Sequence, residues 1–376
     1  MENCIKTYQS DKPEIHLFIL WNSGFRFREA LTDDLKNRFT IKGIIDLNWK
    51  KESFNLNLKR FYGQNLPKNS NKMKECGIGP FTAFIVEDPS PVYAPRVTTR
   101  GVKSVNINVF DVKERYRRIA KNNILHATNS EEESEHDITL LLGKCYHDLN
   151  FETIHLKTIE KDIAGANGWE SIRELLYVLN HTCQYVILRN FEEFPDNIQL
   201  GEHSDIDILC RDYQSTGLIL NGRETTARPW RVQNIVTIGD SFVNVDLRHL
   251  GDGYYDRRWE EDILNNRVFH EKGFYSPNEE DYLYSLLYHG LIQKYRISDD
   301  YVARIGKLCS GMGIAPVDLN DERAAIETLT AYMKRKGYRF VEPEDRTVGY
   351  NFYKIGEKAG VYRSLRRLAS KIKHMF

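Results

Sequence analysis

Paired cysteines are missing from the sequence. Its six cysteines lie singly along 376 residues, and no two of them form a Cys-x-x-Cys motif. A disulfide framework and a structural zinc site both need cysteines at short, regular spacing, so the sequence predicts neither. We therefore expect a protein of a reducing compartment whose chemistry does not depend on thiols.

Long hydrophobic runs and a dominant sign of charge are also missing. No apolar stretch reaches the roughly 18 residues needed to span a bilayer, and the polar start of the chain does not resemble a signal peptide. Lysine plus arginine and aspartate plus glutamate number 53 each. This neutrality argues against a surface that attracts nucleic acid as a whole. We expect a cytoplasmic protein without a nucleic-acid partner.

The chain is long enough for more than one domain, because single cores stop growing near roughly 250–300 residues. It contains no internal repeat and no low-complexity segment. We predict an α+β protein of four parts. These are an amino-terminal domain at 1–150, a second core at 151–252, a helical domain at 253–340 and an extension at 341–376.

Apolar runs bounded by proline and glycine indicate strands in the first part, and apolar residues at helical spacing indicate helices. The acidic stretch 131–135 predicts a helix start, where negative charge is favoured by the helix dipole. The predicted strands are 14–20, 81–88 and 102–109, and the predicted helices are 28–38 and 111–120.

The second half combines strands and helices in a different order. A helix within 169–181 leads into a strand at 184–190. Gly239-Asp240 predicts the turn of a hairpin. The hairpin strands are 231–238 and 241–250, and the helices that follow are 257–267 and 279–295.

Two aspartates stand one residue apart in the apolar run 204–209. Side chains alternate faces along a strand, so Asp205 and Asp207 project to the same side. Asp246 lies on the second strand of the hairpin, which can place it beside this pair. Three convergent carboxylates repel one another unless a multivalent cation neutralises them. Two Mg²⁺ or Mn²⁺ ions could do so while clamping a phosphate and activating an attacking oxygen.

The order of helix, strand, Ser-Asp-Ile-Asp-Ile-Leu and a later strand with Val-Asp-Leu resembles the nucleotidyltransferase superfamily, whose fold is polymerase beta-like. The resemblance covers about residues 165–250. It implies that Asp205, Asp207 and Asp246 are the catalytic metal ligands of a transferase.

Candidate phosphate contacts surround this motif. Where the superfamily has Gly-Ser after its first strand, this chain has Leu-Arg-Asn-Phe, so Arg189 and Asn190 are candidates to contact phosphate. Ser204, just before the aspartate pair, and Arg248, just after Asp246, are further candidates for substrate or phosphate binding.

The stretch 184–250 also resembles nucleotidyltransferase-like proteins encoded near cell-surface glycan genes. This resemblance implies transfer of a nucleotidyl or substituted phosphoryl group, such as a sugar-alcohol phosphate, from a nucleotide-activated donor to a sugar or glycan hydroxyl. Two alternatives stay open: an adenylyltransferase that modifies a protein or a small molecule, and an inactive nucleotide-binding regulatory protein.

A second motif, Asn-Ile-Leu-His-Ala-Thr-Asn-Ser-Glu, begins at Asn123. It resembles the Asn-x-x-His-Gly-Ser-Asp-Ser motif of nucleoside diphosphate kinase, over most of 14–143. The resemblance implies a ferredoxin-like fold. It also implies that His126 stands in place of the phosphorylated histidine, Thr128 in place of the following serine, and Asp137 in place of the glutamate that orients the histidine.

The turn after the first strand departs from that kinase. It reads Trp-Asn-Ser-Gly at 21–24, without the lysine that contacts phosphate. A phosphohistidine intermediate needs positive groups that balance charge in the transition state. We therefore predict a nucleotide- or phosphate-binding relative of the kinase, and leave open residual phosphotransfer by His126 and a purely structural histidine.

The tail 361–376 carries one apolar and one basic helical face. Such a helix can lie on an anionic membrane, each basic residue near the surface adding about 1 kcal/mol. It can equally pack on its own domain. Peripheral attachment to the inner face of the membrane is therefore a second expectation for localisation.

Overall fold

The structure is a computed structural model that describes residues 7–63, 71–98, 101–151, 158–198, 200–201, 205–228, 231–294 and 296–356. It is an α+β protein with two five-stranded sheets and surrounding helices. The chain divides into two compact units: one up to Glu170 with His181–Cys183 and Leu218–Asn221, the other holding the remaining residues. The predicted boundaries at 150, 252 and 340 stay a prediction. Ser204 and the tail 361–376 lie outside the described residues.

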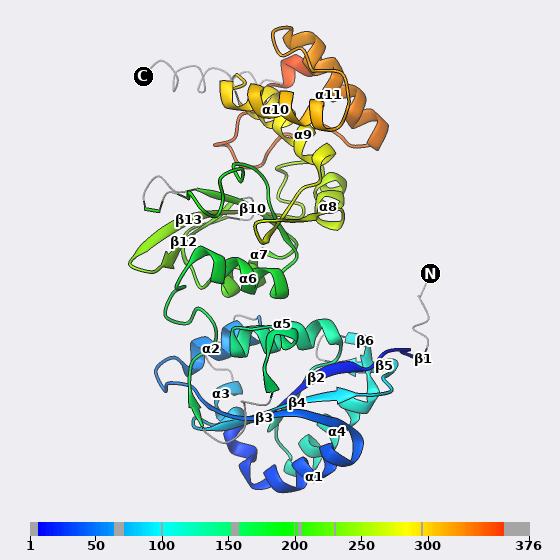
Figure 1. The fold of residues 1–376 in the computed structure, drawn as a ribbon, viewed down its shortest axis with the longest axis vertical. Coiled ribbons are helices and arrows are strands. Elements are labelled where there is room, and N and C mark those ends of the chain that lie inside the picture. Colours follow the sequence, from blue (N-terminus) through cyan, green and yellow to red (C-terminus); the bar gives the residue numbers. More distant parts are fainter. Residues whose placement is uncertain are drawn as a thin grey trace. The chain divides into compact units, whose positions relative to one another are not determined.

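The first unit is built on a five-stranded sheet (Figure 1). Four neighbouring strands of this sheet pair antiparallel, and the short strand at one edge is parallel to its neighbour. The strand order is β7 (Leu125–Ala127), β2 (Glu14–Leu20), β4 (Phe81–Asp88), β3 (Thr40–Asn48) and β8 (Ile159–Glu160).

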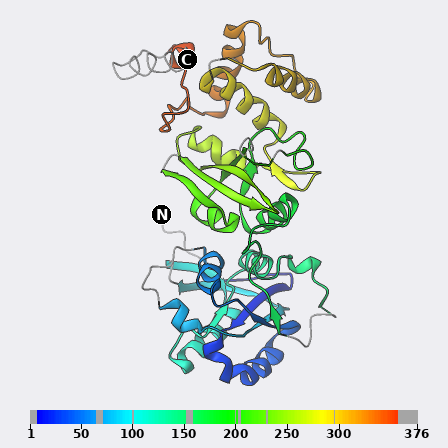
Figure 2. The same cartoon turned by 90° about the vertical axis from the view of Figure 1, so that its left-hand side faces the viewer.

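Helices cover both faces of this sheet (Figures 1 and 2). Helices α1 and α4 lie on one face, where their apolar residues join those of β2, β4 and β7 in one core. Helix α5 lies on the other face. Every residue of β2 is buried, as expected for a strand covered on both sides. The helices are α1 (Arg28–Arg38), α2 (Phe54–Phe61), α3 (Lys72–Cys76), α4 (Ile107–Ala120) and α5 (Glu131–Leu142), and a small sheet holds β1 (Tyr8–Gln9), β5 (Val92–Thr98) and β6 (Gly101–Asn106).

Most predicted elements of the first unit are confirmed. The strands at 14–20 and 81–88 and the helix at 28–38 have the predicted bounds. Helix α5 begins in the acidic stretch, as predicted, because Ser130 caps it by accepting a hydrogen bond from the N–H of Glu133.

The strand predicted at 102–109 is wrong in its last three residues. Strand β6 ends at Asn106, and α4 begins at Ile107 instead of 111. Asn106 is the N-cap: its Oδ1 accepts hydrogen bonds from the N–H groups of Asn108 and Val109, at 3.0 and 3.4 Å. The β-branched residues had favoured a strand, but the cap satisfies the first amides of a helix.

The second unit also contains a five-stranded sheet. All neighbouring strands are antiparallel except β10 and β13, which run parallel. Helices α6 (Ile172–Thr182) and α7 (Tyr213–Leu220) lie along one face (Figure 1). The strand order is β11 (Arg223–Arg228), β12 (Arg231–Ile238), β13 (Ser241–His249), β10 (Ile206–Cys210) and β9 (Tyr185–Ile187).

The predicted hairpin is confirmed as β12 and β13, but the strand predicted at 184–190 is shorter. Strand β9 ends at Ile187, although the N–H of Leu188 still donates to the carbonyl of Asp207 at 2.9 Å. Asn190 then adopts a φ of 61°, in the left-handed region, which ends any extended conformation.

The carboxy-terminal part of the described chain is mainly helical, as predicted. The helix predicted at 279–295 is an α-helix that ends in one π-helical turn at His289–Gln293. No described helix is long and apolar enough to cross a membrane. The elements are α8 (Arg257–Asn265), β14 (Val268–His270), β15 (Phe274–Ser276), α9 (Glu279–Tyr288), α10 (Asp299–Gly311) and α11 (Glu322–Lys336).

We expect the substitution Asn106→Ala to loosen the start of α4. Loss of an N-cap weakens a helix by about 1 kcal/mol, which corresponds to roughly fivefold faster amide exchange. Hydrogen–deuterium exchange of peptides covering 107–112 measures this. The control is Asn37→Ala, an exposed asparagine within α1. Equal exchange of the 107–112 peptides in both variants would contradict the capping role.

Candidate functional site

The parallel pairing of β10 with β13 brings three carboxylates together. Asp207 and Asp246 are direct partners in the register of the two strands. Asp205 immediately precedes β10 and, two residues from Asp207, projects to the same side. One carboxylate oxygen from each of the three lies within 4.8 Å of the others. The structure therefore places the three predicted metal ligands in one cluster.

Burial and mutual repulsion both disfavour ionisation of these carboxylates. Asp207 and Asp246 are buried, and Asp205 is exposed. Although Asp205 is exposed, partial desolvation of its carboxyl group, with repulsion from Asp207 and Asp246, raises its pKa from 3.8 to about 6 against the opposing charges of Arg189 and Arg231. Burial also raises the pKa of Asp246, with Arg248 opposing and Asp207 adding to the shift. The cluster thus favours binding of a proton or a cation.

Two arginines offset part of this charge. Arg189 donates from Nε to Asp207 Oδ2 at 2.9 Å, and Arg248 Nη2 lies 3.8 Å from Asp246 Oδ2. Both guanidinium groups lie over the ring of Tyr254, 5.6 and 4.4 Å from its centroid. An arginine therefore lies beside each of the two buried carboxylates of the cluster, and both arginines make cation–π contacts with Tyr254.

One buried oxygen of the cluster has no hydrogen-bond partner among the described residues. Asp246 Oδ1 is buried and accepts no hydrogen bond from the described residues. A buried carboxylate oxygen without a partner is costly, so native structures fill such positions. Carboxylates such as those of Asp205, Asp207 and Asp246 are the ligands that Mg²⁺ and Mn²⁺ prefer. The residues present therefore fit a hard divalent cation.

The other residues predicted for this site lie as follows. Asn190 is exposed, and its Oδ1 accepts a hydrogen bond from Arg304 Nη1 at 2.8 Å. Arg189 and Arg248 are buried beside the carboxylates, and their contact with phosphate stays a prediction. Asp345 was missed by sequence reasoning: it lies 3.4 Å from Arg248, yet 99 positions further along the chain than Asp246, and no motif surrounds it.

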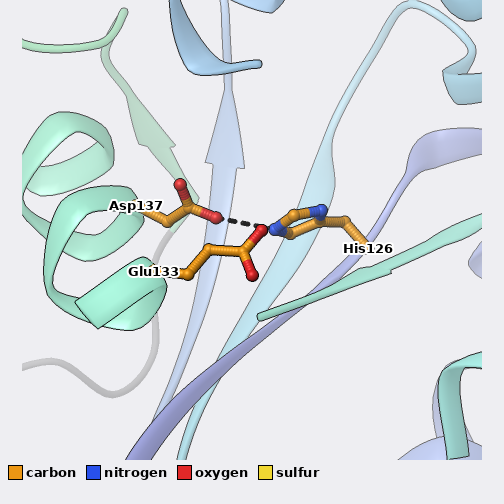
Figure 3. Close-up of side chains that lie close together, drawn as sticks. All are labelled: His126, Glu133 and Asp137. Atoms are coloured by element: carbon orange, nitrogen blue, oxygen red, sulfur yellow. Dashed lines mark hydrogen bonds and ion pairs between the residues drawn. The ribbon is translucent and has the colours of Figure 1, made fainter. Parts of the chain in front are cut away.

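A second cluster of possible ligands surrounds His126 in the first unit (Figure 3). His126 lies on β7, whereas Glu133 and Asp137 lie one turn apart on α5. His126 Nε2 is 2.7 Å from Asp137 Oδ2, and His136 Nδ1 is 2.9 Å from Asp137 Oδ1. Glu133 Oε2 accepts hydrogen bonds from the backbone N–H and Nδ2 of Asn129, at 2.6 and 2.7 Å.

Hydrogen bonds within the protein already satisfy this second cluster. Burial alone would raise the pKa of Asp137, but its hydrogen bonds with His126 and His136 lower it. The rings of Phe61 and Tyr62 pack edge-on against the His126 imidazole, with centroids 5.2 and 5.6 Å away. His126 and Asp137 therefore form a buried histidine–aspartate pair.

Thr128 and Asn123 have hydrogen-bond partners other than His126. Thr128 is fully buried; its Oγ1 lies 3.1 Å from His16 Nδ1 and accepts from the N–H of Leu17 at 3.1 Å. Asn123 Nδ2 donates to Glu75 Oε2 at 3.1 Å. Their predicted roles in phosphate chemistry stay predictions.

We expect Asp205→Asn to stabilise the protein at pH 7 when no divalent cation is present. A folded-state pKa of about 6, above 3.8, means that stability is lost as the pH rises through this window. The substitution removes that penalty, so the melting temperature should rise by about 2 °C at pH 7 and by less at pH 4. The control is Asp33→Asn, an exposed aspartate of the first unit. A lower melting temperature of Asp205→Asn at pH 7 would contradict the repulsion.

We expect no phosphohistidine at His126 after incubation with radiolabelled ATP, because its ring is buried and the turn at 21–24 has no lysine to balance the charge of a phosphohistidine intermediate. A nucleoside diphosphate kinase serves as the positive control. Acid-labile label that His126→Ala abolishes would show that the histidine still transfers phosphate.

The comparisons with known proteins give a partial similarity. No protein-family model and no curated protein matches this chain. Among solved structures, the nucleoside diphosphate kinase of Aquifex aeolicus, in an orthorhombic crystal form, is similar at 17% sequence identity with a TM-score of 0.23. The similarity covers 34% of this chain and 92% of that kinase. It is weak and extends over about a third of the chain.

Proposed function

We propose that the second unit is a metal-dependent transferase of the nucleotidyltransferase fold. The observation that carries the proposal is the carboxylate cluster of Asp205, Asp207 and Asp246, in which a buried oxygen lacks a hydrogen-bond partner. Such a cluster is hard to explain by stability alone, because gathering like charges costs free energy unless a cation is bound.

The three aspartates would hold Mg²⁺ or Mn²⁺. The cation would supply charge stabilisation to a transferring phosphoryl group. Arg189 and Arg248, each beside one of the ligands, would add positive charge on the donor phosphates. Asp246 is the candidate base for the acceptor hydroxyl.

The donor is a nucleotide or nucleotide-activated group, and the acceptor is a hydroxyl of a sugar or glycan. Transfer of a nucleotidyl or sugar-alcohol phosphate group in cell-surface glycan synthesis follows from the resemblance at 184–250. An adenylyltransferase would use the same cluster with ATP, and an inactive regulatory protein would not need it. The cluster therefore favours an enzyme in the second unit.

For the first unit we propose a nucleotide- or phosphate-binding domain of ferredoxin-like topology. The antiparallel order β7-β2-β4-β3, with helices α1 and α4 between strands, supports this topology. The turn at 21–24, which has no lysine to contact phosphate, supports binding rather than phosphotransfer. A cytoplasmic location, peripheral at the membrane through 361–376, remains our proposal for localisation.

The test is a thermal-shift panel of ATP, CTP, UTP, CDP-glycerol, CDP-ribitol and UDP-sugars, with and without Mg²⁺. The correct donor at about 100 times its Kd should raise the melting temperature by about 5 °C, and only with Mg²⁺. Asp246→Asn should lose this rise, whereas Asp33→Asn should keep it. A shift independent of Mg²⁺ and of Asp246 would move the nucleotide away from the carboxylate cluster and refute the proposal.

A further inference from the structure

Asp345 joins the carboxylate cluster from a distant part of the chain. It follows α11, in an irregular segment, and its side chain is buried. Its Oδ1 accepts hydrogen bonds from the backbone N–H and the Oγ1 of Thr347, at 2.9 and 2.7 Å. These two bonds fix the carboxylate, so that Oδ2 faces the arginines of the neighbouring strands.

Two arginines meet Asp345 Oδ2. Arg248 lies 3.4 Å away through both Nη1 and Nη2, and Arg231 Nε lies 3.9 Å away. Arg231 is itself tied to the same segment, because its Nη1 donates to Thr347 Oγ1 at 2.9 Å. Although burial would raise the pKa of Asp345, Thr347 and the two arginines lower it, so the residue is an anion at neutral pH.

The charges of Asp246, Asp252 and Asp345 all act on Arg248, and of Asp246 and Asp345 it lies closer to Asp345. Its Nη2 is 3.4 Å from Asp345 Oδ2 but 3.8 Å from Asp246 Oδ2. The arginine is therefore shared. The Asp246 side chain also has a hydrogen bond with Gln233, while its Oδ1 has no hydrogen-bond partner among the described residues. In a site that binds a cation, a ligand oxygen has to stay clear of competing donors.

We propose that Asp345 is a positioning residue that draws Arg248 away from Asp246 and so keeps Asp246 open to a divalent cation. This inference rests on the proposed function of the cluster. Residues that hydrogen-bond the neighbours of metal ligands commonly tune metal affinity in this way.

The physical reason is competition for one positive group. Opposite charges attract strongly where water is excluded, so a buried guanidinium that loses one carboxylate moves toward the other. Without the charge of Asp345, Arg248 would be held by Asp246 and Asp252 alone and would move closer to Asp246. A cation would then have to displace that arginine before it could bind, and its affinity would fall.

The experiment measures Mn²⁺ binding to the intact protein by electron paramagnetic resonance of the free ion, without nucleotide. Asp345→Asn should weaken Mn²⁺ binding about tenfold. Asp196→Asn removes one exposed carboxylate of the same unit and should leave the affinity unchanged. Melting temperatures of all variants confirm that they are folded.

A double variant separates positioning from a structural role. Adding Arg248→Gln to Asp345→Asn removes the competing guanidinium and should restore Mn²⁺ affinity. Adding Arg231→Gln removes the same charge but leaves Arg248 in place, and should restore less. Equal restoration by both, or none by Arg248→Gln, would overturn the inference.

Failure of the proposed function gives a different result. If the unaltered protein binds no Mn²⁺, the metal site itself is refuted. If it binds Mn²⁺ and Asp345→Asn binds it equally well, the metal site stands and the positioning role of Asp345 is refuted.

Discussion

The parallel pairing of β10 with β13 is the constraint on which the candidate site depends. Its register sets Asp207 directly opposite Asp246, and the alternation of side chains adds Asp205. A shift of one residue in this register would turn one of the two paired aspartates to the opposite face of the sheet. The apolar residues next to the aspartates hold the register, since Ile206, Ile208 and Val245 are buried.

The distribution of hydrogen bonds separates the two clusters of possible metal ligands. Around His126, hydrogen bonds within the protein reach both carboxylate oxygens of Asp137 and Oε2 of Glu133. Around Asp246 a buried oxygen has no donor among the described residues, although Arg248 is within 4 Å of the same carboxylate. Both clusters contain carboxylates, but we expect a bound cation at the cluster of Asp246, because a buried carboxylate oxygen without a hydrogen bond indicates a missing ligand.

Local signals predicted most elements that could be compared. The strands at 14–20 and 81–88, the helix at 28–38 and the hairpin turn at Gly239-Asp240 follow from apolar spacing and turn residues. The secondary-structure prediction was wrong at the ends of two predicted strands, 102–109 and 184–190. Asn106 caps a helix where the surrounding Val and Ile residues had favoured a strand. The strand predicted at 184–190 ends at Ile187, and Asn190 has a left-handed backbone.

The sequence by itself determined which residues could form a carboxylate cluster, because the spacing of Asp205 and Asp207 and the hairpin that carries Asp246 are local features. Only the tertiary structure decided that β13 lies parallel to β10, that His126 is satisfied by Asp137, and that Asp345 contacts Arg248. Periodicity reports which face a side chain occupies within one element. Pairing between elements, and the burial that sets charge and pKa, depend on contacts between residues far apart in the chain.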